Sequence, residues 1–192
     1  MGPQGPQGEV GPPGPQGPTG EPGAGAIIPF SSGNDILINT RSGGVSGVPA
    51  FIGFGGSAVS QNFLESPINL SNERSNFAFI VPRTGRLTSF SALFSTSIPH
   101  NFTNTTVTVS AQIFRGSTGN NVFLPLPATL LQLQPNYSGM VPTGSIVYAS
   151  TDNLNIDLNP NDRLLLVVFV NACGQEAVIN LRGFVSAGIH IK

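Results

Sequence analysis

Few side chains in this sequence could carry chemistry, and their spacing does not bring them into a reactive group. The chain holds two histidines, His100 and His190, and a single cysteine, Cys173. Metal centres and cysteine nucleophiles need these residue types at recognisable spacings, and none of those spacings is present. We interpret His190 as a histidine on a strand face, with a zinc or proton-transfer role as the minor alternative. Cys173 is predicted to be an unreactive loop thiol that forms no intrachain disulfide.

The richest cluster of oxygen ligands runs from Asp152 to Asp162, and a calcium site is one interpretation of it. The segment lacks the glycine turn and the terminal glutamate of an EF-hand loop. Alternation places Leu154, Ile156 and Leu158 on one face of a strand, and residues 159–162 carry a turn pattern. A strand followed by a turn is therefore the preferred interpretation, and the calcium site is the alternative.

Composition and motifs exclude several further classes of function. The chain carries 8 Lys+Arg against 9 Asp+Glu, so we expect no basic groove for nucleic acid. Its longest apolar run is far shorter than the roughly 20 residues that span a bilayer. No G-x-S-x-G motif is present, and the few titratable residues form no catalytic spacing. We therefore predict a protein that is not an enzyme, needs no cofactor or metal, and binds neither nucleic acid nor a membrane.

Residues 1–25, named the Gly-X-Y segment, repeat glycine at every third position from Gly2 to Gly23. Only glycine fits at the axis of a collagen triple helix, and the frequent proline presets the extended backbone. The segment is therefore predicted to be a collagen-like triple-helical stalk, which requires three chains. Because so short a stalk spans only about 70 Å at roughly 3.1 Å per residue, we expect the following domain to hold the three chains together.

Residues 26–192, named the head, form the second predicted domain and are expected to be all-β, because short apolar or alternating runs are broken by glycine, proline and asparagine. The predicted strands are Ile27–Phe30, Asp35–Asn39, Phe51–Phe54, Asn76–Val81, Leu87–Thr96, Thr105–Phe114, Leu130–Leu133, Ser145–Ser150, Leu154–Leu158, Arg163–Val170 and Ala177–Ile191. Strands of this number and length favour a two-sheet antiparallel jelly-roll sandwich. In such a fold the first and last strands should lie side by side.

Four stretches of the chain carry a resemblance to a known family. They are Ala26-Ile27-Ile28-Pro29-Phe30-Ser31-Ser32-Gly33, Gly53-Phe54-Gly55, Asn76-Phe77-Ala78-Phe79-Ile80-Val81-Pro82-Arg83 and Ser186-Ala187-Gly188-Ile189. With the Gly-X-Y segment before them, the chain resembles the collagen-like glycoproteins of the spore surface, or exosporium, of Bacillus and Clostridium. The resemblance implies a homotrimeric head similar to the complement C1q and tumour necrosis factor families. It also implies a location on the spore surface and O-linked sugar on Thr19 of a Gly-Pro-Thr triplet.

Seven successive apolar residues in one predicted strand suggest where the subunits meet. They are Leu164, Leu165, Leu166, Val167, Val168, Phe169 and Val170. An antiparallel strand with one wet face should alternate, so both faces of this strand must be covered. Since the outer face of a two-sheet sandwich has no obvious cover within its own chain, we predict that this run forms the trimer interface. The pattern leaves open which alternate set faces the trimer axis.

Together these patterns predict a structural function. The head selects three chains, sets their register and nucleates the triple helix of a surface filament in a spore outer coat. The alternative is an adhesin or recognition head that binds host or matrix ligands in the manner of C1q-like domains. The first residues carry no secretory leader pattern, so the expected location rests on the resemblance alone.

Overall fold

Short alternating runs separated by turn residues form antiparallel strands in the computed structural model, which describes residues 1–9, 11–17, 23, 25–175 and 178–192. Sheet 1 has six strands: β1 (Ala26–Ser31), β2 (Ile36–Asn39), β7 (Gly85–Thr96), β12 (Ile146–Thr151), β13 (Ile156–Leu158) and β15 (Asn180–Ile191). Sheet 2 has nine: β3 (Ala50–Ile52), β4 (Ser57–Val59), β5 (Ile68–Asn69), β6 (Phe79–Ile80), β8 (His100–Gly116), β9 (Val122–Pro125), β10 (Leu131–Gln132), β11 (Tyr137–Val141) and β14 (Arg163–Gly174).

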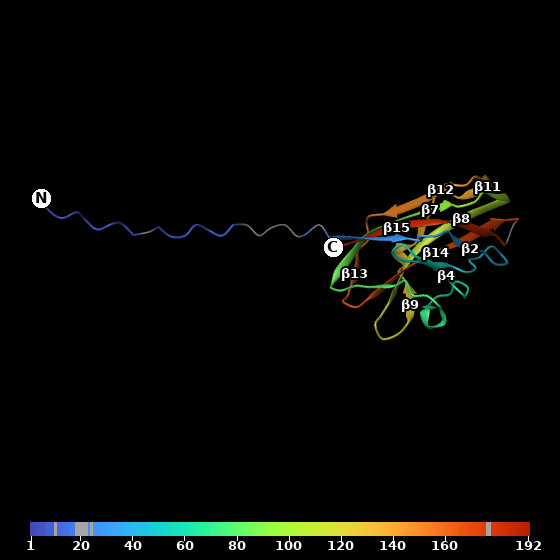
Figure 1. Cartoon of the computed structure of the whole chain (residues 1–192), viewed down its shortest axis with the longest axis horizontal. Coiled ribbons are helices and arrows are strands. Elements are labelled where there is room, and N and C mark those ends of the chain that lie inside the picture. The colour runs from blue at the N-terminus through green and yellow to red at the C-terminus, as the bar shows by residue number, and fades with distance from the viewer. Residues whose placement is uncertain (10, 18–22, 24, 176–177) are drawn as a thin grey trace.

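The two sheets stack face to face around one apolar core (Figure 1). Among the described residues there is no α-helix, only the 3₁₀ turns η1 (Leu70–Asn72) and η2 (Pro127–Thr129). Alternation in β8 buries Val107, Val109 and Ile113 against sheet 1, as the sequence pattern indicates. The expected all-β fold, a two-sheet antiparallel sandwich of the jelly-roll type, is confirmed.

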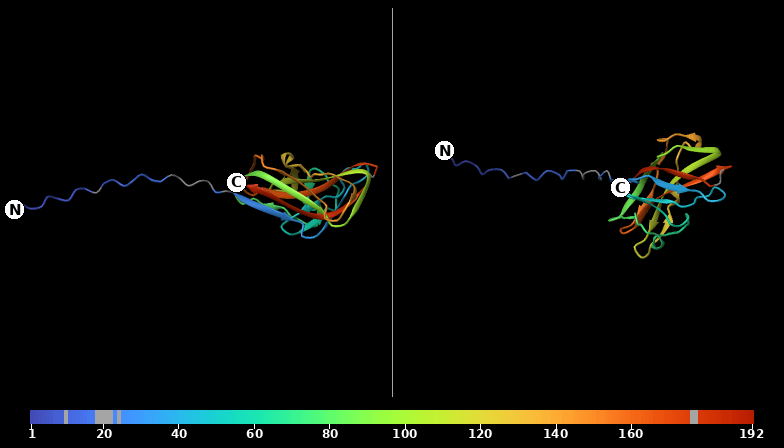
Figure 2. Two further views of the ribbon diagram at one scale, coloured as in Figure 1. Left: turned by 90° about the horizontal axis from the view of Figure 1, so that it is seen from above. Right: turned by 45° about the vertical axis from the view of Figure 1, so that its right-hand side comes forward.

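The first and last strands of the head pair with each other. β1 runs antiparallel to β15, from Ala26 opposite Ile191 to Ser31 opposite Ser186. This confirms the predicted pairing and brings the C-terminal residue to the point where the Gly-X-Y segment joins the head. Figure 2 shows both at the same end of the sandwich from two further directions. The described residues of the segment extend away from that end without strand or helix.

Several strand boundaries differ from the sequence-based prediction. The predicted strand Asn76–Val81 contracts to the two residues of β6. Four strands, β4, β5, β9 and β11, were not predicted. β4 and β5 are only three and two residues long, Pro125 ends β9, and Gly139 interrupts β11. Gly139 has φ of 60° and lies where the pairing of β11 with β8 shifts register. A bulge of this kind hides the period-two pattern on which strand prediction depends.

A second apolar cluster lies on the outer side of sheet 2. Leu165, Val167 and Phe169 of β14 pack there with Phe51, Phe114 and Phe123 of neighbouring strands. The segment that connects β4 to β6 covers them: Ile68 and Leu70 are buried in this cluster, and Leu64, Phe77 and Ala78 pack against it. One side of sheet 2 therefore faces the core and the other lies beneath a folded part of the same chain.

This cover corrects the reasoning behind the predicted trimer interface at Leu164–Val170. All seven side chains are at most 9% exposed within a single chain. The set that includes Leu164 and Leu166 belongs to the main core, and the set that includes Leu165 and Val167 belongs to the outer cluster. The expectation that β14 needs a neighbouring subunit is wrong in its premise, because the sequence pattern did not reveal that residues 60–78 fold over it.

We expect aspartate to destabilise the head from either face of β14. Leu166→Asp and Val167→Asp each bury an unpaired carboxylate, which costs several kcal/mol and lowers the melting temperature by roughly 10 °C. Thermal unfolding followed by circular dichroism measures this. Asn171→Asp, at an exposed position of the same strand, is the matched control and should leave the melting temperature nearly unchanged. If Val167→Asp keeps its stability and changes only the oligomeric mass, the outer face is covered by another copy.

Candidate functional site

The histidines and the cysteine lie on different strands and do not form one site. His100 begins β8, stacks on Phe102 with ring centroids 5.5 Å apart, and accepts the Arg182 backbone N–H at 3.4 Å. His190 lies in β15, with Nδ1 2.8 Å from the Thr88 hydroxyl. Cys173 is exposed near the end of β14. In the part of the chain that the structure describes, no three His, Cys, Asp or Glu side chains are grouped to hold a metal ion.

Two carboxylates of the segment Asp152–Asp162, the candidate calcium site, form ion pairs with arginines. Asp157 pairs with Arg86 at 2.9 Å, and Asp162 pairs with Arg115 at 2.6 Å. Asp162 also accepts the backbone N–H of Asn159 at 2.7 Å, which closes the turn at residues 159–162. The two carboxylates serve separate arginines on β7 and β8, so the arrangement favours the strand and turn over the calcium alternative. Thr19, the predicted glycosylation site, lies outside the described residues.

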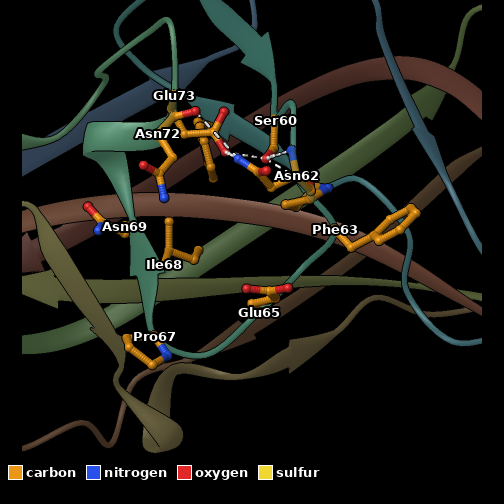
Figure 3. Close-up of a pocket in the computed structure, with 11 residues that line it drawn as sticks. Ser60, Asn62, Phe63, Glu65, Pro67, Ile68, Asn69, Asn72 and Glu73 are labelled. Carbon is orange, nitrogen blue, oxygen red and sulfur yellow. Dashed lines mark hydrogen bonds between the residues drawn. The ribbon is translucent and has the colours of Figure 1, made fainter.

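A small pocket beneath the segment that connects β4 to β6 contains a network of polar side chains (Figure 3). Glu73 accepts hydrogen bonds from the Ser60 hydroxyl at 2.6 Å, the Gln61 backbone N–H at 2.9 Å and the Asn62 amide at 3.0 Å. Both carboxylate oxygens are therefore used within the chain. With a volume of about 90 Å³, the pocket is small for an organic ligand. We interpret Glu73 as a clasp that holds the cover over β14.

A second candidate site is the outward side of sheet 1. Strand register aligns outward residues in four rows across β1, β15, β7 and β12. The rows are Phe184, Ser95 and Ile146; Ser31, Ser186, Leu93 and Tyr148; Pro29, Gly188, Ser91 and Ser150; and Ile27, His190 and Ser89. These rows are named the sheet-1 outer face. Ile27 is 76% exposed and Tyr148 64%, so large apolar groups face solvent in a single chain.

Charge is confined to the two ends of this face. The Arg86–Asp157 pair lies at the end nearest the Gly-X-Y segment, and Arg182 lies 3.5 Å from Asp35 at the other end. Between them the four rows contain no Asp, Glu, Lys or Arg. Small residues such as Ser91 and Gly188 make a shallow depression beside Tyr148. Large apolar side chains beside a floor of small residues form a surface suited to packing against another protein surface.

Sequence reasoning missed this face. Its apolar residues are scattered one or two to a strand, and they alternate with buried neighbours, so no single strand has an unusual pattern. Ile146 and Tyr148 on β12 lie beside Ser95 and Leu93 only through register. The available signal was that residues 87–151 contain a single charged residue, Arg115, in strands with serine at alternate positions, and serine alone is a weak indicator.

A comparison with known proteins finds a collagen-like relative. No family model matches the chain. It is 26% identical over 177 residues to Collagen-like protein 1 of Acanthamoeba polyphaga mimivirus, a match that covers 88% of this chain but only 19% of that protein. No helix among the described residues is long and apolar enough to cross a membrane.

Two solved structures are distantly similar in shape. The Eiger TNF of S. frugiperda has a TM-score of 0.37 at 12% identity, over 85% of this chain and 91% of the other. A structure of infectious bursal disease virus, Gx strain, has a TM-score of 0.37 at 9% identity, over 87% of this chain and 32% of the other. The fold assignment rests on the strand pairing itself, and none of the three names describes an enzyme.

We expect His100 to make stability depend on pH. Burial lowers the pKa of His100 from its usual 6.5, so below that pH the unfolded chain binds more protons than the folded chain. The free energy of unfolding should therefore fall as the pH drops below about 6.5. Between pH 7.5 and 5 the melting temperature of the wild type should drop further than that of His100→Gln. Equal slopes in the two proteins would contradict the assignment.

Proposed function

We propose that the chain is a structural protein whose head assembles three copies through the sheet-1 outer face and nucleates a collagen triple helix in the Gly-X-Y segment. The observation that carries the proposal is the direct continuity between the segment and β1, the strand that begins this face. The collagen-like relative supports a structural role for a head attached to such a segment. The adhesin alternative stays a prediction, since neither the fold nor that relative's name points to a ligand.

The glycine spacing supports three chains. In the single chain, the described glycines between Gly2 and Gly23 have open space where a Cβ would lie. Nothing in one extended chain therefore requires glycine at every third position. Three chains wound about a common axis do require it, because only hydrogen fits there.

The position of the segment limits where the axis can run. In a triple helix the three chains lie close together, so the three copies of Gly25 must converge on one line. Ala26 follows directly and pairs with Ile191 in sheet 1. Ile27 and Pro29 then point outward on the sheet-1 outer face. This face, rather than the covered side of sheet 2, therefore lies nearest the axis.

The chemistry of the face supports burial between copies. A cyclic trimer uses two different surfaces on each copy, one for each neighbour. The β1 and β15 part, with Ile27 and Phe184, supplies one surface, and the edge strand β12, with Ile146 and Tyr148, supplies the other. Removing such side chains from water contributes about 25 cal/mol per Å² of apolar area, and no charge in these rows has to be desolvated.

The experiment is to measure oligomeric mass by sedimentation for the full chain and for residues 26–192. Both should sediment as three chains. Tyr148→Asp places an unpaired charge in the interface. At a protein concentration of about 10 μM it should shift the mass toward that of one chain. The β-sheet signal in circular dichroism should stay unchanged. Leu124→Asp is the matched control, because Leu124 is also exposed but lies on β9 of sheet 2. A monomeric wild-type head would contradict the proposal.

We further propose that the assembled protein lies in the outer coat of a spore, as the resemblance implies. An antibody against the head, used in immunogold labelling of intact spores from the source organism, should decorate their outermost layer. Labelling restricted to the interior of the cell would contradict this location. The result bears on location only, because the trimer is tested separately.

A further inference from the structure

The end of the sandwich that carries the Gly-X-Y segment is open. A cavity of about 170 Å³ enters there between the sheets. Its walls come from three places: Ala26 and Ile28 of β1, residues 79–85 between β6 and β7, and the chain end at Ile191 and Lys192. Ile28, Phe79 and Ile191 also pack against the main core, so the cavity is an extension of the core toward solvent.

A crossing segment keeps the cavity open and shaped. Residues 81–85 pass from sheet 2 to sheet 1, held at one end by the Val81 N–H on the Asp162 carbonyl, at 2.8 Å. At the other end Arg86 and Lys192 exchange two backbone hydrogen bonds, of 2.7 and 2.9 Å. Gly85 lies so close to β15 that a Cβ would meet Ile191 Cγ2 at 2.8 Å. Because both ends are hydrogen bonded to strands, the walls are set by the fold.

Two cations stand at the opening of this apolar cavity. Arg83 and Lys192 line it and are both exposed. The nearby Asp157 is 2.9 Å from Arg86 and forms an ion pair with it. The α-carboxylate of Lys192 offsets the ammonium of the same residue, so the Arg83 guanidinium is what makes the opening positive, whereas the walls inside it are aliphatic and aromatic.

We propose that this cavity binds small amphipathic anions, in which an aromatic ring or short branched chain carries one carboxylate. A dry cavity of roughly 150 Å³ accepts benzene, so a single ring matches this volume. With the ring between Ile28 and Phe79, a carboxylate would lie at the opening, where the Arg83 guanidinium offers paired N–H donors. Ile28 lines the cavity from the inner side of β1, whereas Ile27 and Pro29 lie on the opposite side of the strand, in the sheet-1 outer face.

Fluorine NMR of the full chain tests the proposal with 4-fluorobenzoate as the probe. The fluorine line should shift and broaden as the protein concentration rises. The titration should give a dissociation constant of about 1 mM or below. Fluorobenzene tests the ring without the charge and should bind at least threefold more weakly. 4-Fluorobenzylammonium, which carries the opposite charge, should bind most weakly.

Variants assign the binding to this cavity. Arg83→Gln should weaken the binding of 4-fluorobenzoate about fivefold and leave the binding of fluorobenzene unchanged. Arg74→Gln is the same change at an exposed arginine outside the cavity and should alter the binding of neither probe. Ile28→Phe fills the interior and should abolish both signals. Thr84→Trp blocks the opening from an exposed position and gives the same test if Ile28→Phe does not fold. Unchanged binding in a folded Ile28→Phe or Thr84→Trp protein, or equal effects of Arg83→Gln and Arg74→Gln, would overturn the proposal.

Discussion

The antiparallel pairing of β1 with β15 is the contact on which the rest of the architecture depends. Six consecutive residue pairs, from Ala26 with Ile191 to Ser31 with Ser186, join the beginning of the head to its end. Because the strand that follows the Gly-X-Y segment lies within sheet 1, the segment must leave from the end of that sheet (Figure 1). The same pairing sets Ile27 and Pro29 outward, beside the rows contributed by β15, β7 and β12. Ala26 and Ile28 of β1 and Ile191 of β15 also line the apolar cavity at this end.

Burial of β14 on both faces explains why the head can be stable as a unit before any assembly. Its inner residues belong to the main core, and its outer residues lie under the segment that connects β4 to β6. This connecting segment, residues 60–78, contains little regular secondary structure. Specific contacts therefore hold it in place, among them the three hydrogen bonds accepted by Glu73. A carboxylate with both oxygens satisfied stabilises such a loop without leaving an oxygen unsatisfied near the core. Sheet 2 is thereby closed to partners along β14, and sheet 1 remains available.

Charged side chains lie at the two ends of sheet 1 and are absent from the rows between them. The chain has only 17 charged side chains, 8 basic and 9 acidic, so their positions are informative. Ion pairs such as Arg86 with Asp157 and Arg182 with Asp35 lie at the ends of sheet 1, and the area between them is uncharged. Exposed pairs of this kind contribute little to stability. Their effect is positional, because they limit the uncharged area of sheet 1 at each end.

Local patterns in the sequence determined the fold class and the Gly-X-Y repeat, because period-two burial and the glycine period are properties of each segment by itself. The pairing of the end strands followed from the fold class. The parity of β8 follows in the same way from Val107, Val109 and Ile113. The run Leu164–Val170 shows the limit of such reasoning: the pattern correctly required cover on both faces, but only the tertiary structure decided that residues 60–78 supply it. The sheet-1 outer face and the cavity beside Ile28 were likewise decided by tertiary structure. Each is assembled from strands far apart in the chain, and register between strands, which no single segment encodes, determines which side chains stand together.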